Sequence, residues 1–110
     1  MKKIELNLVN YKFEGRDEKN NPKVFTVNMK DELSTLLRVN GVYDNGIEIC
    51  DGVEVAKQIK DCKDKTLELS GTEHKLIKKV LDKLIANETF RLGGVRYEEM
   101  IIRVFKAVEV

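Results

Sequence analysis

The chain has 110 residues, of which 42 % are hydrophobic and 35 % are charged, and its formal net charge is +1. This length predicts one domain, residues 1–110, whose core needs neither disulfides nor a metal, and the apolar content excludes a disordered chain. Residues 1–30 hold seven basic and four acidic residues, residues 31–62 three and seven, and residues 63–110 ten and eight. The middle third is therefore acidic, and so mild an asymmetry argues against a dedicated duplex-binding protein.

The start of the chain predicts a soluble, cytoplasmic protein. Met1-Lys2-Lys3 is followed at once by alternating residues, so neither a long apolar run nor a small-residue cleavage site follows the basic start. The longest apolar runs, such as Met100-Ile101-Ile102, are far shorter than the roughly 20 residues that cross a bilayer. We therefore expect no signal peptide and no contact with a membrane.

The first 29 residues predict a β-hairpin. Apolar and polar residues alternate from Ile4, and the alternation shifts register near Val9, which is typical of a strand with a bulge. The polar segment of residues 14–23, which holds the only proline, predicts a long loop. Alternation resumes at Phe25. The hairpin is thus predicted to pair Lys3–Phe13 with Lys23–Met29.

Two helices are predicted in the acidic middle of the chain. Asp31-Glu32 suits a helix start, leucines follow at helical spacing, and Asn40-Gly41 ends the helix because glycine adopts a left-handed conformation. Next, Asn45-Gly46 lies between short apolar segments, which fits either a tight hairpin turn or an ordered loop. Asp51 is then predicted to cap a helix with Val55, Ile59 and Cys62 on one face.

The most specific local signal is Ser70-Gly71-Thr72-Glu73, which matches a capping box. It predicts a helix from Gly71 to Ala86. The wide apolar stripe of this helix comprises Leu76, Ile77, Val80, Leu81, Leu84 and Ile85. Lysines occupy its other side, and we interpret them first as the charged face that a core helix needs to stay soluble.

The segment after this helix allows two structures. Phe90 to Tyr97 alternates about Gly93-Gly94, as in a hairpin with a two-residue turn. Apolar residues from Tyr97 to Val108, in contrast, keep helical spacing, and Glu98-Glu99 lies early, where a helix dipole favours anions. We favour a loop through Gly94 and then a last helix. If that helix ends before Ala107, the closing "AVEV" could add a strand.

These elements predict an α+β fold, with a β-hairpin (residues 1–29) packed on about four helices in a mainly helical remainder (residues 30–110). The helix from Gly71 to Ala86 is expected to be the central one.

Residues for catalysis or metal binding are scarce. Cys50, Cys62 and the only histidine, His74, are too few for a zinc site. Ser70 lies one turn before His74, but it is better used as the helix cap. We therefore expect no enzyme, no cofactor and no metal; an enzyme acting through His74 would need a defined pocket around it.

Basic residues define one candidate binding surface. Two arginines and a tyrosine flank the double glycine, where guanidinium groups and a ring could meet a single nucleic-acid strand or an acidic protein. Together with the lysines of the preceding helix, they make nucleic-acid binding the alternative function. The candidate residues are Lys75, Lys79, Lys83, Arg91, Arg96 and Tyr97.

The last helix indicates a second kind of partner. Met100, Ile102 and Val110 fall off its main apolar face and could form an intermolecular one. We therefore predict a non-enzymatic protein-binding or assembly module that forms a homo-oligomer or binds another protein.

Three stretches also carry a resemblance. They are the hairpin end "FTVNMKDELSTLL", the capping-box region "LELSGTEHKLIKKVL" and the closing amphipathic helix. In this layout the chain resembles small accessory proteins encoded in tail, early or accessory gene clusters of Gram-positive phages and prophages. The resemblance implies a non-enzymatic accessory role and carries no catalytic residue onto this sequence.

Overall fold

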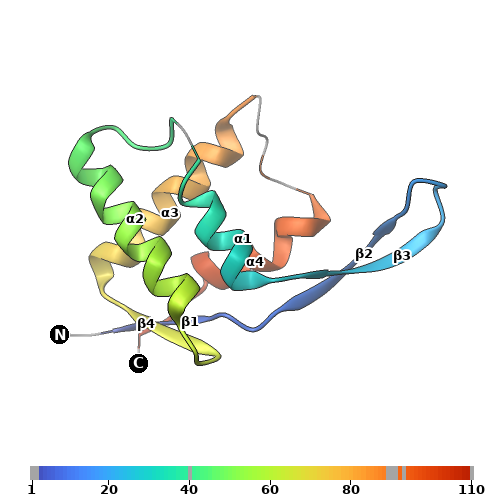
Figure 1. Cartoon of the computed structure of the whole chain (residues 1–110), viewed down its shortest axis with the longest axis horizontal. Coiled ribbons are helices and arrows are strands. Elements are labelled where there is room, and N and C mark those ends of the chain that lie inside the picture. Colours follow the sequence, from blue (N-terminus) through green and yellow to red (C-terminus); the bar gives the residue numbers. More distant parts are fainter. Residues whose placement is uncertain (1–2, 40, 89–91, 93, 110) are drawn as a thin grey trace.

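The computed structural model describes residues 3–39, 41–88, 92 and 94–109. It confirms the α+β fold, with a β-hairpin and four helices in the part of the chain described (Figure 1). The strands are β1 (Ile4–Asn7), β2 (Tyr11–Arg16), β3 (Pro22–Val27) and β4 (Thr66–Leu69). The helices are α1 (Met29–Leu36), α2 (Gly46–Asp61), α3 (Gly71–Ala86) and α4 (Val95–Phe105).

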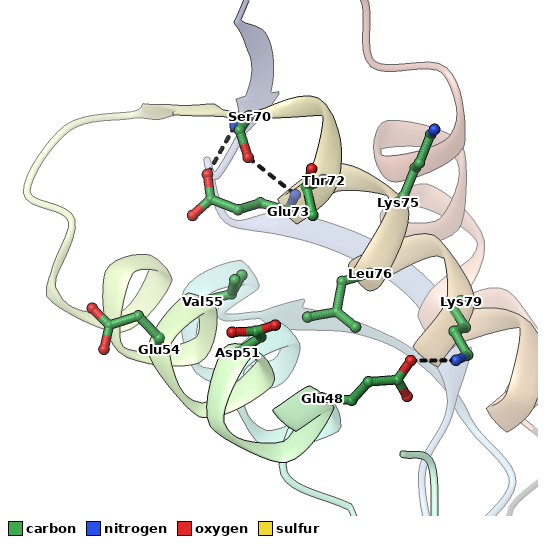
Figure 2. A pocket seen from close by; sticks show the side chains of 10 residues that line it. All are labelled: Glu48, Asp51, Glu54, Val55, Ser70, Thr72, Glu73, Lys75, Leu76 and Lys79. Carbon is green, nitrogen blue, oxygen red and sulfur yellow. Dashed lines mark hydrogen bonds and ion pairs between the residues drawn. The ribbon is translucent and has the colours of Figure 1, made fainter. Parts of the chain in front are cut away.

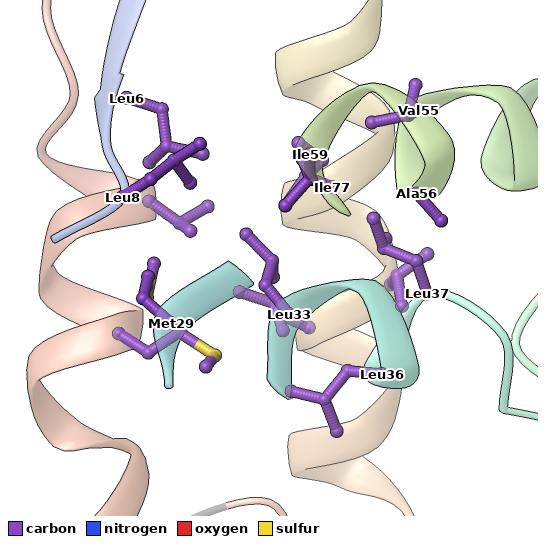
Figure 3. Close-up of a cluster of buried hydrophobic side chains, with 14 of the residues drawn as sticks. Leu6, Leu8, Met29, Leu33, Leu36, Leu37, Val55, Ala56, Ile59 and Ile77 are labelled. Atoms are coloured by element: carbon purple, nitrogen blue, oxygen red, sulfur yellow. The ribbon is translucent and has the colours of Figure 1, made fainter. Parts of the chain in front are cut away.

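One hydrophobic core joins the helices to the first strand. Leu6 and Leu8 from the N-terminal segment, Met29 and Leu33 from α1, and Ile77 from α3 are buried together (Figure 3). The buried stripe of α3 is narrower than predicted, since Leu76 is half-buried and Ile85 is exposed. The buried members of α3 are His74, Ile77, Val80, Leu81 and Leu84.

The predicted hairpin is correct in position but too long in its first arm. β2 pairs with β3 in antiparallel register, with Tyr11 opposite Val27, whereas β1 leaves the hairpin and pairs with β4. β4 is absent from the predicted elements. In this second pair Ile4 lies opposite Leu69, and Leu69 and Leu6 are fully buried, so the pairing carries apolar side chains into the core.

Two asparagine side chains stabilise the turn between β1 and β2, where a bulge was predicted. The Asn7 side-chain oxygen accepts from the Val9 amide at 2.9 Å, which turns the chain locally. The Asn10 oxygen accepts from the Met29 amide at 3.1 Å and so ties this turn to the start of α1. The register shift near Val9 is therefore a boundary between two strands.

Asparagine also begins the first two helices, ahead of the predicted acidic starts. The Asn28 side chain accepts from the Asp31 amide and starts α1 at Met29. The Asn45 side chain accepts from the Glu48 amide, so α2 starts at Gly46 and the predicted cap Asp51 lies inside the helix. The Asn45-Gly46 prediction of a turn or loop is wrong, because a side-chain oxygen that satisfies the first amides favours a helix start over a turn.

The end of α1 agrees only in part with the prediction. The helix stops at Leu36, earlier than expected. Gly41 has φ +85°, the left-handed conformation expected of it, while Asn40 lies outside the described residues.

The capping box of α3 is confirmed in both directions. The Glu73 amide donates to the Ser70 hydroxyl oxygen at 3.1 Å, and the Ser70 amide donates to the Glu73 carboxylate at 2.8 Å. The second Glu73 oxygen accepts from the Gln58 side chain at 2.9 Å. The helix cap thus also ties α3 to α2.

The preferred structure of the C-terminal segment is confirmed, because Gly94 precedes a helix that starts at Val95. Phe90, Arg91 and Gly93 lie outside the described residues. The helix ends at Phe105, and the tail then runs beside β1, where the Glu5 amide donates to the Val108 carbonyl at 3.2 Å. An extra strand was predicted for this tail, and in the structure the tail forms an isolated β-bridge between Ile4 and Glu109.

The β2–β3 hairpin forms an arm that projects from the helical body (Figure 1). It contributes to the elongated overall shape, with dimensions of 48 × 30 × 22 Å. The Phe13 and Phe25 rings stack across the arm with centroids 5.2 Å apart. A Cβ atom added at Gly15 would lie 3.1–3.3 Å from carbons of these two rings. Glycine at this position therefore leaves room for the rings to lie over the strand.

Gly52 lies in the interior of α2, where alanine normally stabilises a helix by about 1 kcal/mol relative to glycine. A Cβ at this position would overlap the Tyr43 ring, whose hydroxyl is held by a 2.6 Å hydrogen bond to the Leu37 carbonyl. We predict that Gly52→Ala lowers the free energy of unfolding, measured in urea, because overpacking costs about 1–3 kcal/mol.

The matched control is Gly46→Ala at the first residue of the same helix, where an added Cβ meets open space and should not destabilise. Tyr43→Ala should remove most of the cost of Gly52→Ala in the double variant. If the losses in unfolding free energy of the two single variants simply add up in the double variant, the steric explanation is contradicted.

Candidate binding surfaces

A groove of about 420 Å³ lies between α2 and α3 (Figure 2). Val55 and Leu76 give it an apolar floor, and the capping box of α3 closes one end. Carboxylates line its α2 side, and Lys75 and Lys79 line its α3 side. Two of the predicted binding residues therefore belong to a groove whose opposite wall is acidic.

The predicted lysine surface is largely engaged within the molecule. The Lys79 ammonium lies 2.7 Å from an Asp44 oxygen and 2.6 Å from a Glu48 oxygen. Lys83 pairs with the other Asp44 oxygen. Lys75 is exposed and, of the lysines predicted to bind, is the one without a hydrogen bond or ion pair in the part of the chain described. The acidic start of α2 thus faces the basic row of α3.

These contacts change the acidity of the groups involved. Hydrogen bonds from Lys79 and Lys83 lower the pKa of Asp44 to about 2. The pKa of Glu48 is lowered by the hydrogen bond from the Asp44 backbone amide and by the one from Lys79. Since the carboxylates are at the surface, water and salt screen these pairs and their contribution to stability is small.

Two of the other predicted binding residues, Arg96 and Tyr97, lie where the arm meets the body. Arg96 on α4 pairs with Glu32 on α1, and its guanidinium lies 5.9 Å from the Phe13 ring centroid and 5.8 Å from that of Tyr97. The Tyr11 hydroxyl donates to the Arg96 carbonyl at 2.5 Å. Arg96 and Tyr97 are therefore part of an internal junction, and Arg91 lies outside the described residues.

The outer face of α4 carries an apolar surface that includes one of the three residues predicted for it, Ile102. Met100 is fully buried, which corrects its predicted intermolecular role, and Val110 lies outside the described residues. Ile102 is exposed as predicted. The exposed apolar residues of this helix are Val95 at 55 %, Ile102 at 47 % and Phe105 at 37 %.

We call Val95, Glu98, Glu99, Ile102 and Phe105 the α4 stripe. Its spacing of three, four and seven residues places it on one side of the helix. A shallow cleft of about 230 Å³ separates part of the stripe from Tyr11 and Phe13 of β2. The spacing of these residues is visible in the sequence. The sequence alone does not show which apolar face of α4 the rest of the chain covers and which it leaves exposed.

A third surface lies between the end of α1 and α2. This groove, of about 380 Å³, is mostly apolar, and Ile49 on its edge is 50 % exposed. Arg38 and Lys57 are its only charged lining residues, and in the described part of the chain neither side chain has a hydrogen bond or ion pair. We call it the α1–α2 groove. The groove was not predicted from the sequence because it depends on the unexpected start of α2 at Gly46.

His74 has a structural role in this molecule. Its ring is buried, and Nε2 donates to the Val104 carbonyl at 2.6 Å, which joins α3 to the end of α4. Among the described residues, no three histidine, cysteine or acidic side chains lie together as a metal site. No helix within those residues is both long and apolar enough to cross a membrane.

Comparisons of the chain with protein-family models, with curated proteins and with solved structures give no match.

The Asp44 contacts predict a specific titration. Because the pKa of the folded state lies below the ordinary value of about 3.9, the pairs stabilise the protein above that pH and are lost as the pH falls towards 2. Carboxyl NMR should show Asp44 titrating near pH 2. In Lys79→Met/Lys83→Met the midpoint should rise towards the ordinary value.

Lys75→Met is the matched control, since Lys75 has no ion pair among the described residues, and it should leave the Asp44 midpoint unchanged. An ordinary midpoint for Asp44 in the unmodified protein would show that the lysines do not engage it in solution.

Proposed function

We propose that this chain is a non-enzymatic assembly module that self-associates through the α4 stripe. The observation that carries the proposal is the exposure of Val95, Ile102 and Phe105 on one side of a single helix, beside the cleft next to β2. Monomeric proteins rarely expose large contiguous apolar patches, because their contact with water is unfavourable. A second protein surface would remove these side chains from water.

The arrangement of charges supports a protein partner over nucleic acid. Lys79 and Lys83 are neutralised by Asp44 and Glu48, and Arg96 by Glu32. A phosphate backbone would have to compete with these carboxylates for the same cations. Nucleic-acid binding remains the alternative function, and it predicts an affinity that falls steeply with salt.

The setting of this module is part of the same proposal. The resemblance to accessory proteins of Gram-positive phages and prophages supports a non-enzymatic accessory role, and we propose that the module acts in the cytoplasm. It rests on the hairpin, capping-box and closing-helix sequences.

The test is light scattering coupled to size-exclusion chromatography at tens of micromolar protein. The unmodified chain should be oligomeric, and Ile102→Glu should shift it to monomer because a carboxylate would be buried without a partner. Ile85→Glu is the matched control: this isoleucine is 44 % exposed on α3 and should tolerate the change with no loss of association. A monomeric unmodified chain would overturn the proposal.

The same chromatography with a short single-stranded oligonucleotide distinguishes the alternative. We expect no shift at low or high salt. A shift at low salt only, abolished by replacing Lys75, Lys79 and Lys83 with glutamate, would make the lysine row the functional surface.

A further inference from the structure

The α1–α2 groove has the chemistry of a docking site for an acidic amphipathic helix. Its lining combines apolar side chains, including Val39, Ile49 and Val53, with two cations, Arg38 and Lys57. In a helix-in-groove contact, apolar anchors fill such a groove and charges at its edges select the partner and its orientation.

The α4 stripe has the complementary chemistry. Its apolar residues Val95 and Ile102 are seven positions apart, and Glu98 and Glu99 lie between them. Among the described residues Glu98 has no ion pair, and Glu99 is only loosely paired with Arg103, at 3.9 Å. A stripe with two acids between its apolar residues Val95 and Ile102 thus matches an apolar groove bordered by two unpaired cations.

The two surfaces belong to different parts of the molecule. The groove is lined by the end of α1, the loop after it and α2, whereas the cleft beside the stripe is lined by β2 and α4, and residues of both surfaces are exposed in the single chain. Within one chain, therefore, the stripe does not cover the groove. A second copy can bring them together.

We propose that the α4 stripe of one copy docks into the α1–α2 groove of the next, with Glu98 and Glu99 facing Arg38 and Lys57. This inference rests on the proposed function and names the surface that receives the stripe. Ile102 would then bury against Ile49 and Val53. The contact is head-to-tail, so each copy uses two different surfaces, and the assembly closes into a ring or extends as a filament according to the rotation between copies.

A mixing experiment tests this pairing. Ile102→Glu breaks the stripe and leaves the groove intact, whereas Ile49→Glu breaks the groove and leaves the stripe intact. Each variant alone should be a monomer. An equimolar mixture should form a 1:1 heterodimer and nothing larger, because only one intact stripe and one intact groove can meet. Native mass spectrometry with one variant carrying a mass label measures this directly.

Charge reversal gives a second, independent variant pair at exposed positions. Glu98→Lys and Lys57→Glu should each weaken association by tenfold or more, the effect of opposing like charges in a contact. The two changes combined in one chain should restore much of the loss. Glu54→Lys, which reverses an exposed acid on the other side of α2, is the matched control and should leave association unchanged.

The possible outcomes separate the two proposals. If Ile49→Glu associates like the unmodified chain while Ile102→Glu is monomeric, the stripe pairs with something other than the groove and the inference is overturned, but the proposed function stands. Failure of the mixture to form a heterodimer has the same meaning, provided that circular dichroism shows both variants folded. An unmodified chain that is monomeric overturns both.

Discussion

The buried stripe of α3 is the surface against which α2 and α4 pack, and the position of these helices is set by polar contacts as well as by apolar ones. The capping box starts the helix directly after β4, and Glu73 also accepts from Gln58 of α2. Lys79 reaches the start of α2, and His74 reaches the end of α4. Apolar burial is not directional, so it does not fix how a helix is rotated about its axis or shifted along it. These hydrogen bonds and ion pairs fix both for α2 and α4 relative to α3.

This explains why the lysines of α3 are a poor guide to function. A charged face on a core helix is needed for solubility whatever the protein does. Here part of that face also meets an acidic helix start, where Asp44 lowers the net positive charge available to a ligand. The acidic middle of the chain and the basic last third are, in part, two halves of one internal contact.

Local signals predicted the elements they control directly. The Ser70 capping box and the helix after Gly94 are confirmed because neighbouring residues determine both. β4 could not be found this way: four residues have little propensity of their own and become a strand because β1 pairs with them. Asn45-Gly46 carries signals for both a turn and a helix cap; in the structure the Asn45 side chain caps α2, which also packs against α1 and α3.

The candidate surfaces were harder to predict for a related reason. Helical spacing shows that Met100 and Ile102 point in different directions, but the sequence does not say which direction is the core. The body covers Met100 and leaves Ile102 exposed. The α1–α2 groove depends in turn on Ile49 lying in a helix, which follows from the Asn45 cap.

The charges within the α4 stripe bear on the geometry of any self-association. Glu98 and Glu99 lie midway between Val95 and Ile102, so a two-fold axis that pairs these two apolar residues with each other would place the carboxylates opposite their own copies. Like charges brought together in a desolvated contact are unfavourable, and this acts against a symmetric α4–α4 pair in that register. A surface with cations at its edge removes the repulsion and adds attraction. The same two acids therefore disfavour the symmetric dimer and favour a contact between unlike surfaces, which is the kind that can continue from copy to copy.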